Sequence, residues 1–161
     1  MKYFLPLALI LVAAIDSPAQ TADPDSLTKF VAEYEEAWRS HDAKRLADFF
    51  AEDSDMIVGI EPRISGRAAV ESWWRLYFSR IDSGRVLSIS IESVRILRPD
   101  IALLNVDTTT GGTHSETKEV LESRSARGTW VVTRVGGDWK IAALRAHSPV
   151  GTQRLRPGTD N

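Results

Sequence analysis

Apolar side chains recur every three or four residues over three stretches near the N-terminus, and this spacing predicts three amphipathic helices. The first helix is expected to begin after Ser26, because serine is a favourable N-cap residue. Its apolar stripe consists of Leu27, Phe30, Val31, Tyr34 and Trp38. One face of this helix should therefore pack against the rest of the fold.

Two more helices and a short strand follow. Asp42 is the predicted N-cap of the second helix, and the acidic run 52–55 is expected to end it. Its shared apolar face consists of Leu46, Phe49 and Phe50. A short strand is predicted over residues 56–60. The third helix is expected to open at Ser65 and to close at Gly84, and its stripe consists of Val70, Trp73, Trp74, Tyr77 and Ile81.

From residue 87 the apolar period changes to two, which is typical of strands. The phase of the alternation shifts near Glu92 or Ser93, as one extra residue in a β-bulge would cause. Gly136 and Gly137 predict a tight hairpin, because both tolerate the positive φ that such a turn requires. Three further strands are predicted over residues 101–109, 118–135 and 139–148.

This order of elements predicts an α+β fold in which a strongly curved antiparallel sheet wraps three N-terminal helices. A curved sheet has a concave side. Where helices fill that side only in part, a pocket remains between the sheet and the first and third helices. The architecture therefore suggests that the protein binds a small molecule.

The N-terminal segment has the pattern of a secretory signal peptide. Lys2 precedes an apolar run over residues 3–15, and Ser17 and Ala19 supply the small residues of a cleavage site after Ala19; cleavage after Ala22 is a second possibility. An uncleaved membrane anchor is the other reading, although the run is short for a membrane-spanning helix. We expect a bacterial protein, periplasmic or secreted, that is free of the membrane after cleavage. Its predicted parts are a signal peptide (1–19), a linker (20–25), one folded domain (26–149) and a flexible tail (150–161).

Composition narrows the chemistry. With 20 basic and 22 acidic side chains the net charge is −2, which speaks against a nucleic-acid partner. The chain has no Cys, so it has no disulfide and no thiol nucleophile. Its three histidines are far apart in the sequence, and neither a dinucleotide-binding nor a phosphate-binding glycine loop is present. We therefore expect neither a metal site nor a cofactor.

Four short segments carry a resemblance to a known family. They are an aromatic helix that ends at His41-Asp42, the run Phe49-Phe50-Ala51-Glu52-Asp53, the step Ser65-Gly66-Arg67, and Gly137-Asp138-Trp139-Lys140-Ile141. Together they make the chain resemble the nuclear transport factor 2-like superfamily, and within it the small bacterial SnoaL-like proteins. The resemblance implies a cone-shaped half-barrel, a homodimer formed through the outer face of the sheet, and a superfamily that includes isomerases, dehydratases, cyclases and binding modules.

Ketosteroid isomerase is the enzymatic relative whose catalytic roles can be compared position by position. Its chemistry uses an Asp base, and a Tyr and a protonated Asp that stabilise the oxyanion. The oxyanion Tyr falls on Tyr34, whereas the base falls on Val58 and the second Asp falls near Val131. Valine cannot abstract or donate a proton, so this resemblance does not predict steroid isomerisation.

Polar residues on the last strands complete the candidate site. Arg145 and His147 are expected on the same face as Trp139, Ile141 and Ala143, where they would form a cationic corner if that face is concave. Asn105 and Asp107 share a face of an earlier strand and would either orient a ligand or be solvated on the convex side. The predicted pocket consists of Tyr34, Trp38, Val58, Trp74, Asn105, Asp107, Arg145 and His147.

Three functions remain open on these residues. The first, which we favour, is an exported module that binds a small apolar or aromatic molecule in the pocket. The second is a cofactor-free isomerase, lyase or hydrolase that uses Tyr34 with Asp107 or His147. The third is a dimeric assembly module whose cone is filled by side chains. An open apolar cavity would favour the first, and two titratable groups within reach of one ligand atom would favour the second.

Overall fold

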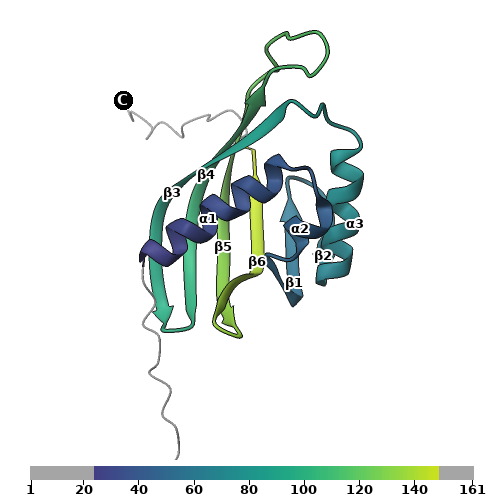
Figure 1. Ribbon diagram of the computed structural model, residues 1–161. Helices are drawn as coiled ribbons and strands as arrows, with labels where there is room; N and C mark the ends of the chain where they lie inside the picture. Colours follow the sequence, from purple (N-terminus) through teal and green to yellow (C-terminus); the bar gives the residue numbers. More distant parts are fainter. Residues whose placement is uncertain (1–23, 149–161) are drawn as a thin grey trace, which may run out of the picture.

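The computed structural model of the protein describes residues 24–148 (Figure 1). The helices are α1 (Pro24–Arg39), α2 (Ala43–Ala47) and α3 (Arg67–Phe78). The strands are β1 (Phe50–Val58), β2 (Ile64–Ser65), β3 (Arg85–Arg98), β4 (Ile101–Gly112), β5 (Arg124–Val135) and β6 (Asp138–His147). The predicted α+β class with three helices before the long strands is confirmed. The predicted signal peptide, most of the linker and the tail lie outside the described residues.

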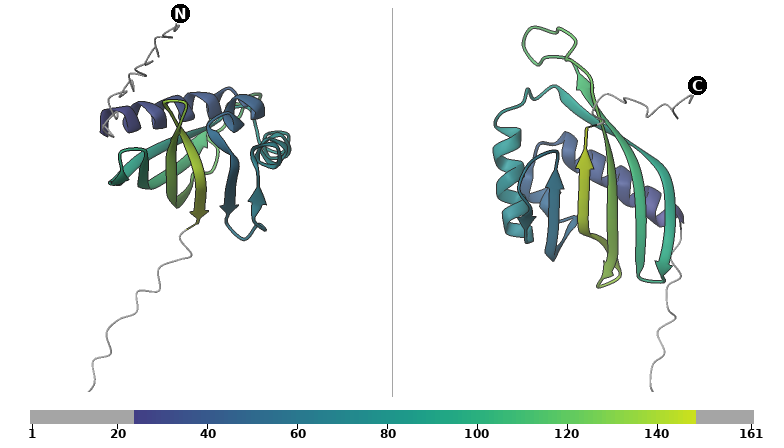
Figure 2. Two further views of the ribbon diagram at one scale, coloured as in Figure 1. Left: turned by 90° about the horizontal axis from the view of Figure 1, so that it is seen from below. Right: turned by 180° about the vertical axis from the view of Figure 1, so that it is seen from behind.

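The strands form one curved, open sheet in the order β2-β1-β6-β5-β4-β3. Every neighbouring pair is antiparallel except β1 and β6, which run parallel. α1 lies across one face of the sheet, and α3 stands beside β1 and β2 (Figure 1). Seen from behind, no helix lies in front of β3 to β6 (Figure 2, right). We call the face under α1 the concave face and the opposite one the convex face.

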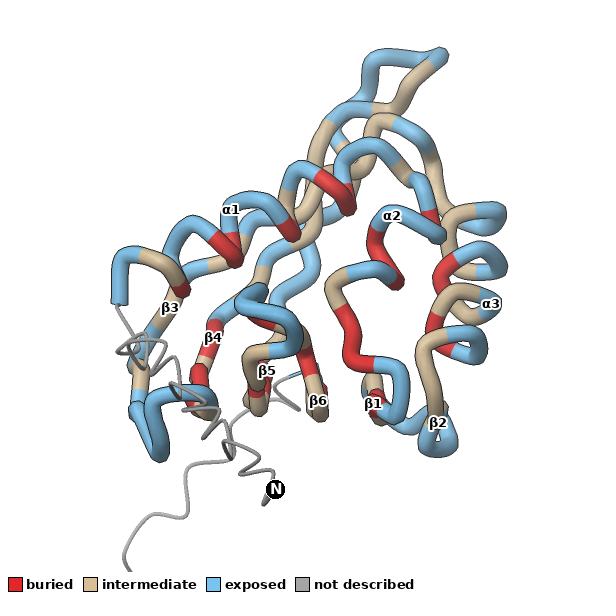
Figure 3. The backbone as a smooth tube through the Cα atoms, turned by 60° about the horizontal axis from the view of Figure 1, so that its bottom comes forward, coloured by how far each residue is buried: buried red, intermediate tan, exposed pale blue. Residues whose placement is uncertain are grey.

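The core lies between α1 and the concave face. All five residues of the predicted stripe on α1 are buried, which confirms that prediction. Buried positions occur on the sides of α1 and the strands that face each other (Figure 3). On the strands these positions include Leu104, Val106, Trp130 and Val132.

Two polar contacts hold α1 on the sheet. The Glu35 carboxylate accepts a hydrogen bond from the backbone N–H of Ile89 on β3, which is an edge strand and would otherwise leave such groups unpaired. At the other end of the helix, Trp139 Nε1 donates to Ser26 Oγ at 3.0 Å. α1 begins at Pro24, so Ser26 lies inside the helix. The prediction that Ser26 is the N-cap of this helix is therefore wrong. Within residues 24–148, no helix is long and apolar enough to cross a bilayer.

The short helix α2 ends earlier than predicted. Asp42 caps it as expected, since its carboxylate accepts hydrogen bonds from Lys44 N and Arg45 N, each at 3.0 Å. The helix stops at Ala47, however, and Phe50 already begins β1. The acidic run 52–55 thus lies within a strand, because pairing of Phe50 and Asp55 with β6 and burial of Phe50, Ser54 and Met56 override the local composition.

The third helix and its neighbours also differ from the prediction. Gly66, with φ +85°, caps α3, while Ser65 pairs with Asp55 in the short strand β2. α3 ends at Phe78, so Ile81 and Gly84 lie in the connection to β3. Pairing of Ser65 with β1 takes this residue out of the helix.

The long strands follow the prediction closely, with one exception. The bulge in β3 lies between Ile91 and Ser93, as predicted. The hairpin at Gly136 and Gly137 is confirmed, with φ values of +62° and +96°. β5 begins only at Arg124, however, because residues 113–123 form a projecting loop whose one isolated bridge pairs Thr113 with Val120.

Candidate functional site

A cavity of about 200 Å³ lies between α1, α3 and the concave face. Helix side chains form one wall, and β3 to β6 with the end of β1 form the other. The lining residues are Tyr34, Trp38, Val58, Trp73, Trp74, Tyr77, Leu87, Thr108, Thr110, Arg124, Ser125, Ala126, Gly128, Trp130, Leu144, Ala146 and Ser148.

The helix side of the cavity is an aromatic wall, which we define as Trp38, Trp73, Trp74 and Tyr77. Trp73 stacks on Tyr77 with ring centroids 5.3 Å apart, and Trp74 packs edge-on against both rings. Trp38 is fixed by an edge contact with Phe78, at 5.5 Å. Stacked and edge-to-face rings stabilise one another, and this wall offers ring faces and edges to a ligand.

The strand register orders the opposite wall from apolar to polar. Leu104, Trp130 and Leu144 are aligned across β4, β5 and β6, and Val106, Gly128 and Ala146 form the next row. Further along, Thr108 is opposite Ala126, and Thr110 is opposite Arg124. Polarity therefore rises towards the loop that joins β4 to β5. We call Thr108, Thr110, Arg124 and Ser148 the polar end of the cavity.

Tyr34 is the most deeply buried polar residue of the cavity. Its ring packs against Trp130 at 4.9 Å and against Phe49 at 5.5 Å, and the side chain is only 2% exposed. Burial raises the pKa of the Tyr34 hydroxyl far above its ordinary value of 10, so the group stays protonated. No residue within 24–148 hydrogen-bonds this hydroxyl. It is available as a donor to a ligand.

One residue of the aromatic wall carries a buried donor without a partner. Trp74 Nε1 is buried and has no acceptor among the residues that the structure describes. Buried polar groups in folded proteins almost always have a partner, so such a donor needs an explanation. A ligand oxygen at this wall would supply one.

At the polar end, the two threonine hydroxyls are already used as donors. Thr108 Oγ1 donates to the Ala126 carbonyl at 3.2 Å, and Thr110 Oγ1 donates to the Arg124 carbonyl at 3.5 Å. Their oxygens remain acceptors. Burial raises the pKa of the neighbouring Tyr77 hydroxyl, while the positive charges of Arg85 and Arg124 act in the opposite direction.

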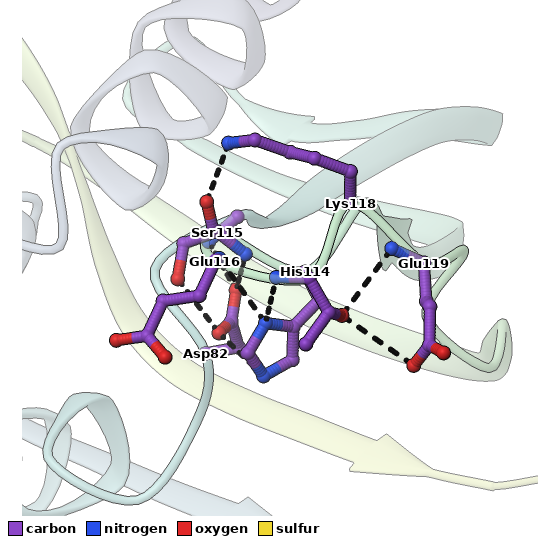
Figure 4. Close-up of polar contacts among 8 residues, drawn as sticks. Asp82, His114, Ser115, Glu116, Lys118 and Glu119 are labelled. Atoms are coloured by element: carbon purple, nitrogen blue, oxygen red, sulfur yellow. Dashed lines mark hydrogen bonds and ion pairs between the residues drawn. The ribbon is translucent and has the colours of Figure 1, made fainter.

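The loop beyond the polar end is tied to the segment between α3 and β3 (Figure 4). Asp82 accepts hydrogen bonds from the backbone N–H groups of Gly84 and Ser115, at 2.7 and 2.8 Å, and from Ser115 Oγ at 2.9 Å. His114 Nδ1 accepts from Glu116 N and Thr117 N, so Nε2 carries the proton and faces Asp82 Oδ2 at 3.2 Å. These bonds hold the base of the loop, and with it Thr110 and Arg124, in place.

Burial and hydrogen bonding act on Asp82 in opposite directions. Partial desolvation raises the pKa of this carboxyl. The hydrogen bonds from Gly84 and Ser115, together with the nearby His114, lower the pKa by more than desolvation raises it, so the net shift is downwards. The ionised carboxylate is therefore the form that anchors the loop.

Four of the eight residues predicted for the pocket line the cavity, namely Tyr34, Trp38, Val58 and Trp74. The other four, Asn105, Asp107, Arg145 and His147, are placed on the convex face, and the predicted cationic corner is corrected accordingly. In β4 the cavity-lining Thr108 and Thr110 alternate with Asp107, which is exposed. Since β-strand side chains alternate between faces, Asn105 and Asp107 point away from the cavity.

A bulge in β6 explains why Arg145 and His147 were predicted on the wrong face of the sheet. Val131 is opposite Ala143 and Val132 is opposite Ile141, so Ala142 is an extra residue. An extra residue in a strand moves the side chains that follow it to the opposite face of the sheet from the one that regular alternation predicts. Trp139 and Ile141 are buried on the concave face before the bulge, and Leu144 and Ala146 line the cavity after it. Arg145 and His147 therefore lie on the other side of the sheet.

On the convex face these residues form cross-strand polar contacts. Asn105 Nδ2 donates to Ser93 Oγ at 3.0 Å, and Thr129 Oγ1 donates to Asn105 Oδ1 at 2.9 Å. Arg127 pairs with Asp107 at 3.2 Å, and Arg145 Nη1 donates to Asp55 Oδ1 at 2.6 Å. The hydrogen bond and charge of Arg145 lower the pKa of Asp55. Tyr34 is thus not brought together with Asp107 or His147.

The sheet also determines where Val58 and Val131 lie, the two positions that correspond to the catalytic Asp residues of ketosteroid isomerase. Val58 lines the cavity, but Val131 lies on the convex side between Leu103 and Ala143. The cavity residue of β5 at this level is Trp130. Among the lining residues of the described chain there is no Asp, Glu or His, so neither a carboxylate nor an imidazole base faces this cavity.

Several lining residues were missed by sequence reasoning, although signals for them existed. Trp73 and Tyr77 belong to the predicted stripe of the third helix. Thr108 and Thr110 continue the alternation of Leu104 and Val106, which would place them on the buried face. Arg124 had no such signal, because its face depends on its pairing with Thr110.

A second, more open cleft of about 590 Å³ lies between α1, α2 and the β5–β6 hairpin. It is lined largely by charged side chains of both signs, among them Lys29, Glu33, Arg45, Asp48 and Asp138. One of its carbonyls, that of Asp48, already accepts a hydrogen bond from Lys140 at 2.7 Å. We regard this cleft as a solvated groove and the aromatic cavity as the candidate site.

A curved sheet wrapped around three helices, with a cavity between them, defines a protein of the nuclear transport factor 2-like fold class. Residues 27–149 match the SnoaL-like domain, and the chain belongs to that family. The predicted resemblance to the nuclear transport factor 2-like superfamily, and within it to the SnoaL-like proteins, is confirmed. A search of curated proteins finds no match to this chain.

Solved structures support the fold. A domain of unknown function with a cystatin-like fold from Nostoc punctiforme is 24% identical, with a TM-score of 0.69, over 83% of this chain and 82% of that one. A nuclear transport factor 2-like protein from Novosphingobium aromaticivorans is 20% identical, with a TM-score of 0.66, over 81% and 84%. A ketosteroid isomerase-like protein from Erwinia carotovora is 14% identical, with a TM-score of 0.64, over 78% and 95%. At these identities the likeness concerns the fold alone.

Proposed function

We propose that this SnoaL-like protein binds a small aromatic molecule in the cavity between α1, α3 and the sheet. The observation that carries the proposal is the aromatic wall with its buried donor Trp74 Nε1, which no residue of the described chain satisfies, beside the hydroxyl of the cavity-lining Tyr34. Apolar surface with a few polar groups at fixed positions is characteristic of ligand pockets. An open cavity also argues against the third alternative, an assembly module whose cone is filled by side chains.

The volume of the cavity restricts the size of the ligand. At about 200 Å³ it is smaller than the sites of drug-sized molecules, which start at roughly 300 Å³. An engineered apolar cavity of about 150 Å³ in another protein accommodates benzene. The proposed ligand is therefore a single aromatic ring with small substituents.

Binding is favoured over catalysis by the chemistry of the lining. Proton abstraction next to a carbonyl needs a base within reach of the substrate carbon. The family position for that base is Val58, and the titratable groups that line the cavity are Tyr34, Tyr77 and Arg124. Burial keeps both tyrosines protonated, so they serve as donors and not as bases.

Occluding the cavity tests the proposal. Ala146→Leu enlarges a side chain on the cavity face of β6, whereas His147→Leu places a leucine at an exposed position on the convex face of that strand, outside the row of Leu103, Val131 and Ala143. We expect p-cresol to quench tryptophan fluorescence of the wild type and of His147→Leu, with a Kd of about 1 mM or tighter. Ala146→Leu should weaken binding about tenfold or more. Equal binding by both variants, each shown to be folded by circular dichroism, would contradict the proposal.

The proposal includes export of the protein, as supported by the sequence of residues 1–19. An apolar run flanked by Lys2 and by a small-residue cleavage site is the pattern that secretion machinery recognises. The binding site would then operate in the periplasm or outside the cell.

We also propose a homodimer formed through the convex face. Leu103, Val131 and Ala143 are aligned in one cross-strand row there and are only partly buried. The same row on a second copy would cover it, since a two-fold axis brings identical patches together. Sedimentation of the wild type and of Leu103→Glu tests this: the wild type should be a dimer and the variant a monomer, and a monomeric wild type would contradict it.

A further inference from the structure

We infer that the ligand is an aromatic anion, whose ring lies against the aromatic wall and whose negative group lies beside Arg124 at the polar end of the cavity. This inference rests on the proposed function and adds the charge and orientation of the ligand. It is carried by the distribution of charge around the cavity.

The first step is the charge of the lining. Arg124 is the single charged side chain among the residues that line the cavity in the described part of the chain. The nearby acidic residues are not among the lining residues: Asp107 lies on the convex face and Glu35 binds the backbone of β3. Asp82 is held by Gly84 and Ser115, and Glu122 pairs with Arg124 outside the cavity. The lining itself therefore carries one positive charge and no negative charge, which favours an anion.

The second step is the position of Arg124. It lies opposite Thr110 and two residues from Ala126, both of which line the cavity, so its side chain starts on the concave face. Its side chain is 71% exposed, which places the guanidinium at the mouth. Its ion-pair partner Glu122 is 3.7 Å away and 79% exposed. An ion pair so exposed contributes little stability, so a ligand anion can replace Glu122.

The third step is a second cation at the same end. Arg85 Nη1 donates to the Glu122 carbonyl at 3.0 Å, and Arg85 precedes the cavity residue Leu87 by two positions on β3. Both arginines act electrostatically on the Tyr77 hydroxyl, which belongs to the aromatic wall. The positive potential therefore reaches the end of the wall and does not stop at the outer surface.

The fourth step excludes the opposite orientation. An anion at the deep end, next to Tyr34, would lose its hydration among Trp130, Phe49 and Leu144 with only neutral donors in reach. Such burial of an unpaired charge is costly. At Arg124 the negative group keeps part of its hydration and gains a bidentate cationic partner.

The test compares two ligands of nearly the same shape, phenylacetate and phenylacetamide, which differ in charge. Four of the five tryptophans line the cavity, so intrinsic fluorescence reports binding, and calorimetry provides Kd values. We expect phenylacetate to bind the wild type about three- to tenfold tighter than phenylacetamide. Raising the salt from about 0.02 M to about 1 M should remove most of this difference, because exposed charges are screened.

Variants at two arginines of β5 locate the effect. Arg124→Gln should make phenylacetate and phenylacetamide bind equally. Arg127→Gln removes the same charge from the convex face, where Arg127 pairs with Asp107, and should retain the preference for phenylacetate. Arg124→Glu should reverse the preference and favour the cation phenethylamine.

The outcomes separate the inference from the proposed function. Equal binding of both ligands to the wild type, or an equal effect of the two Gln variants, would overturn the anionic ligand and leave the aromatic cavity standing. If neither ligand binds the wild type, the proposed function is overturned and the inference with it. The salt dependence of the wild type decides the question even if a variant fails to fold.

Discussion

At the scale of single residues, the hydroxyl of Tyr34 shows how burial assigns a role. The same side chain would be an ordinary solvated phenol on the outside of α1, but at 2% exposure it stays protonated and lacks a partner within the described chain. A ligand in the cavity that accepts a hydrogen bond from this hydroxyl gains the free energy of that bond.

Tyr34→Phe should therefore have opposite effects on stability and on binding. We expect the free energy of unfolding of the empty protein to stay the same or to rise by up to about 1 kcal/mol, because an unpaired polar group is removed. Binding of p-cresol should weaken about two- to tenfold, the value of one hydrogen bond. Chemical denaturation and fluorescence titration measure the two quantities. Toluene, which cannot accept this bond, is the control, and an equal loss of toluene binding would show that the cavity had changed shape.

Asp82 makes a prediction about acid. Its folded-state pKa is lowered below the ordinary 3.8, so the ionised form stabilises the folded protein. This contribution is fully present above about pH 4 and is lost as the pH falls through the lower folded-state value. In thermal unfolding at several pH values, wild type should be more stable than Asp82→Asn at neutral pH, and the difference should shrink below pH 4.

Ser115→Ala refines the acid prediction. It removes one of the three hydrogen bonds to Asp82 and retains the backbone bonds. The pKa of Asp82 should then be lowered less, so the loss of stability in acid should begin at the same pH as in the wild type but should be smaller and should level off at a higher pH. An acid profile identical in the wild type, Asp82→Asn and Ser115→Ala would contradict this role.

At the scale of elements, the loop between β4 and β5 depends on a close approach of two backbones. A Cβ atom at Gly84 would lie 1.8 Å from the carbonyl oxygen of Thr113, whereas a Cβ at Gly111 would meet nothing nearer than Ser123 Oγ at 3.8 Å. Gly84 therefore permits the contact through which the α3–β3 connection supports the polar end of the cavity.

Gly84→Ala should destabilise the protein by about 1–3 kcal/mol, because the backbone must move to make room. Gly111→Ala, the matched change on β4, should alter the free energy of unfolding by less than about 0.5 kcal/mol. Urea denaturation distinguishes the two. Phenylacetate binding should also weaken in Gly84→Ala, since the base of the loop carries Arg124. A Gly84→Ala protein as stable as Gly111→Ala would show that the contact is not required.

At the scale of the whole molecule, the cavity and the N-terminal segment bear on where the protein acts. The SnoaL-like match begins at residue 27, and the predicted export signal precedes it. Cleavage after Ala19 would leave the entire matched region in the mature protein.

The mature chain is therefore expected to begin at Gln20. Expression in a bacterial host, followed by N-terminal sequencing of the periplasmic fraction, should find this terminus, because Ser17 and Ala19 occupy the small-residue positions of the cleavage site. Ala19→Arg should block cleavage and retain the precursor at the membrane. An intact Met1 on membrane-bound wild-type protein would contradict the prediction, and a start at Asp23 would indicate cleavage after Ala22.

Much of the fold could be predicted because its signals are local. The apolar stripe of α1, the Asp42 cap, the bulge near Glu92 and the hairpin at Gly136-Gly137 each depend on residues within one or two turns or strands. Together with four family segments, they were enough for the α+β class, the SnoaL-like family and three of the helix residues that line the cavity. Tyr34, Trp38 and Trp74 lie on helices whose buried face is visible in the sequence.

Only the tertiary structure decided which strand residues face the cavity. One extra residue, Ala142, reverses the faces of β6 and moves Arg145 and His147 to the convex side, and nothing in the local alternation marks it. Pairing with β6 likewise converts the acidic run 52–55 into a strand, and pairing with Thr110 brings Arg124 to the cavity. Strand register depends on pairing with residues that are distant in sequence. A shift of one residue therefore moves side chains from the cavity face of the sheet to the convex face.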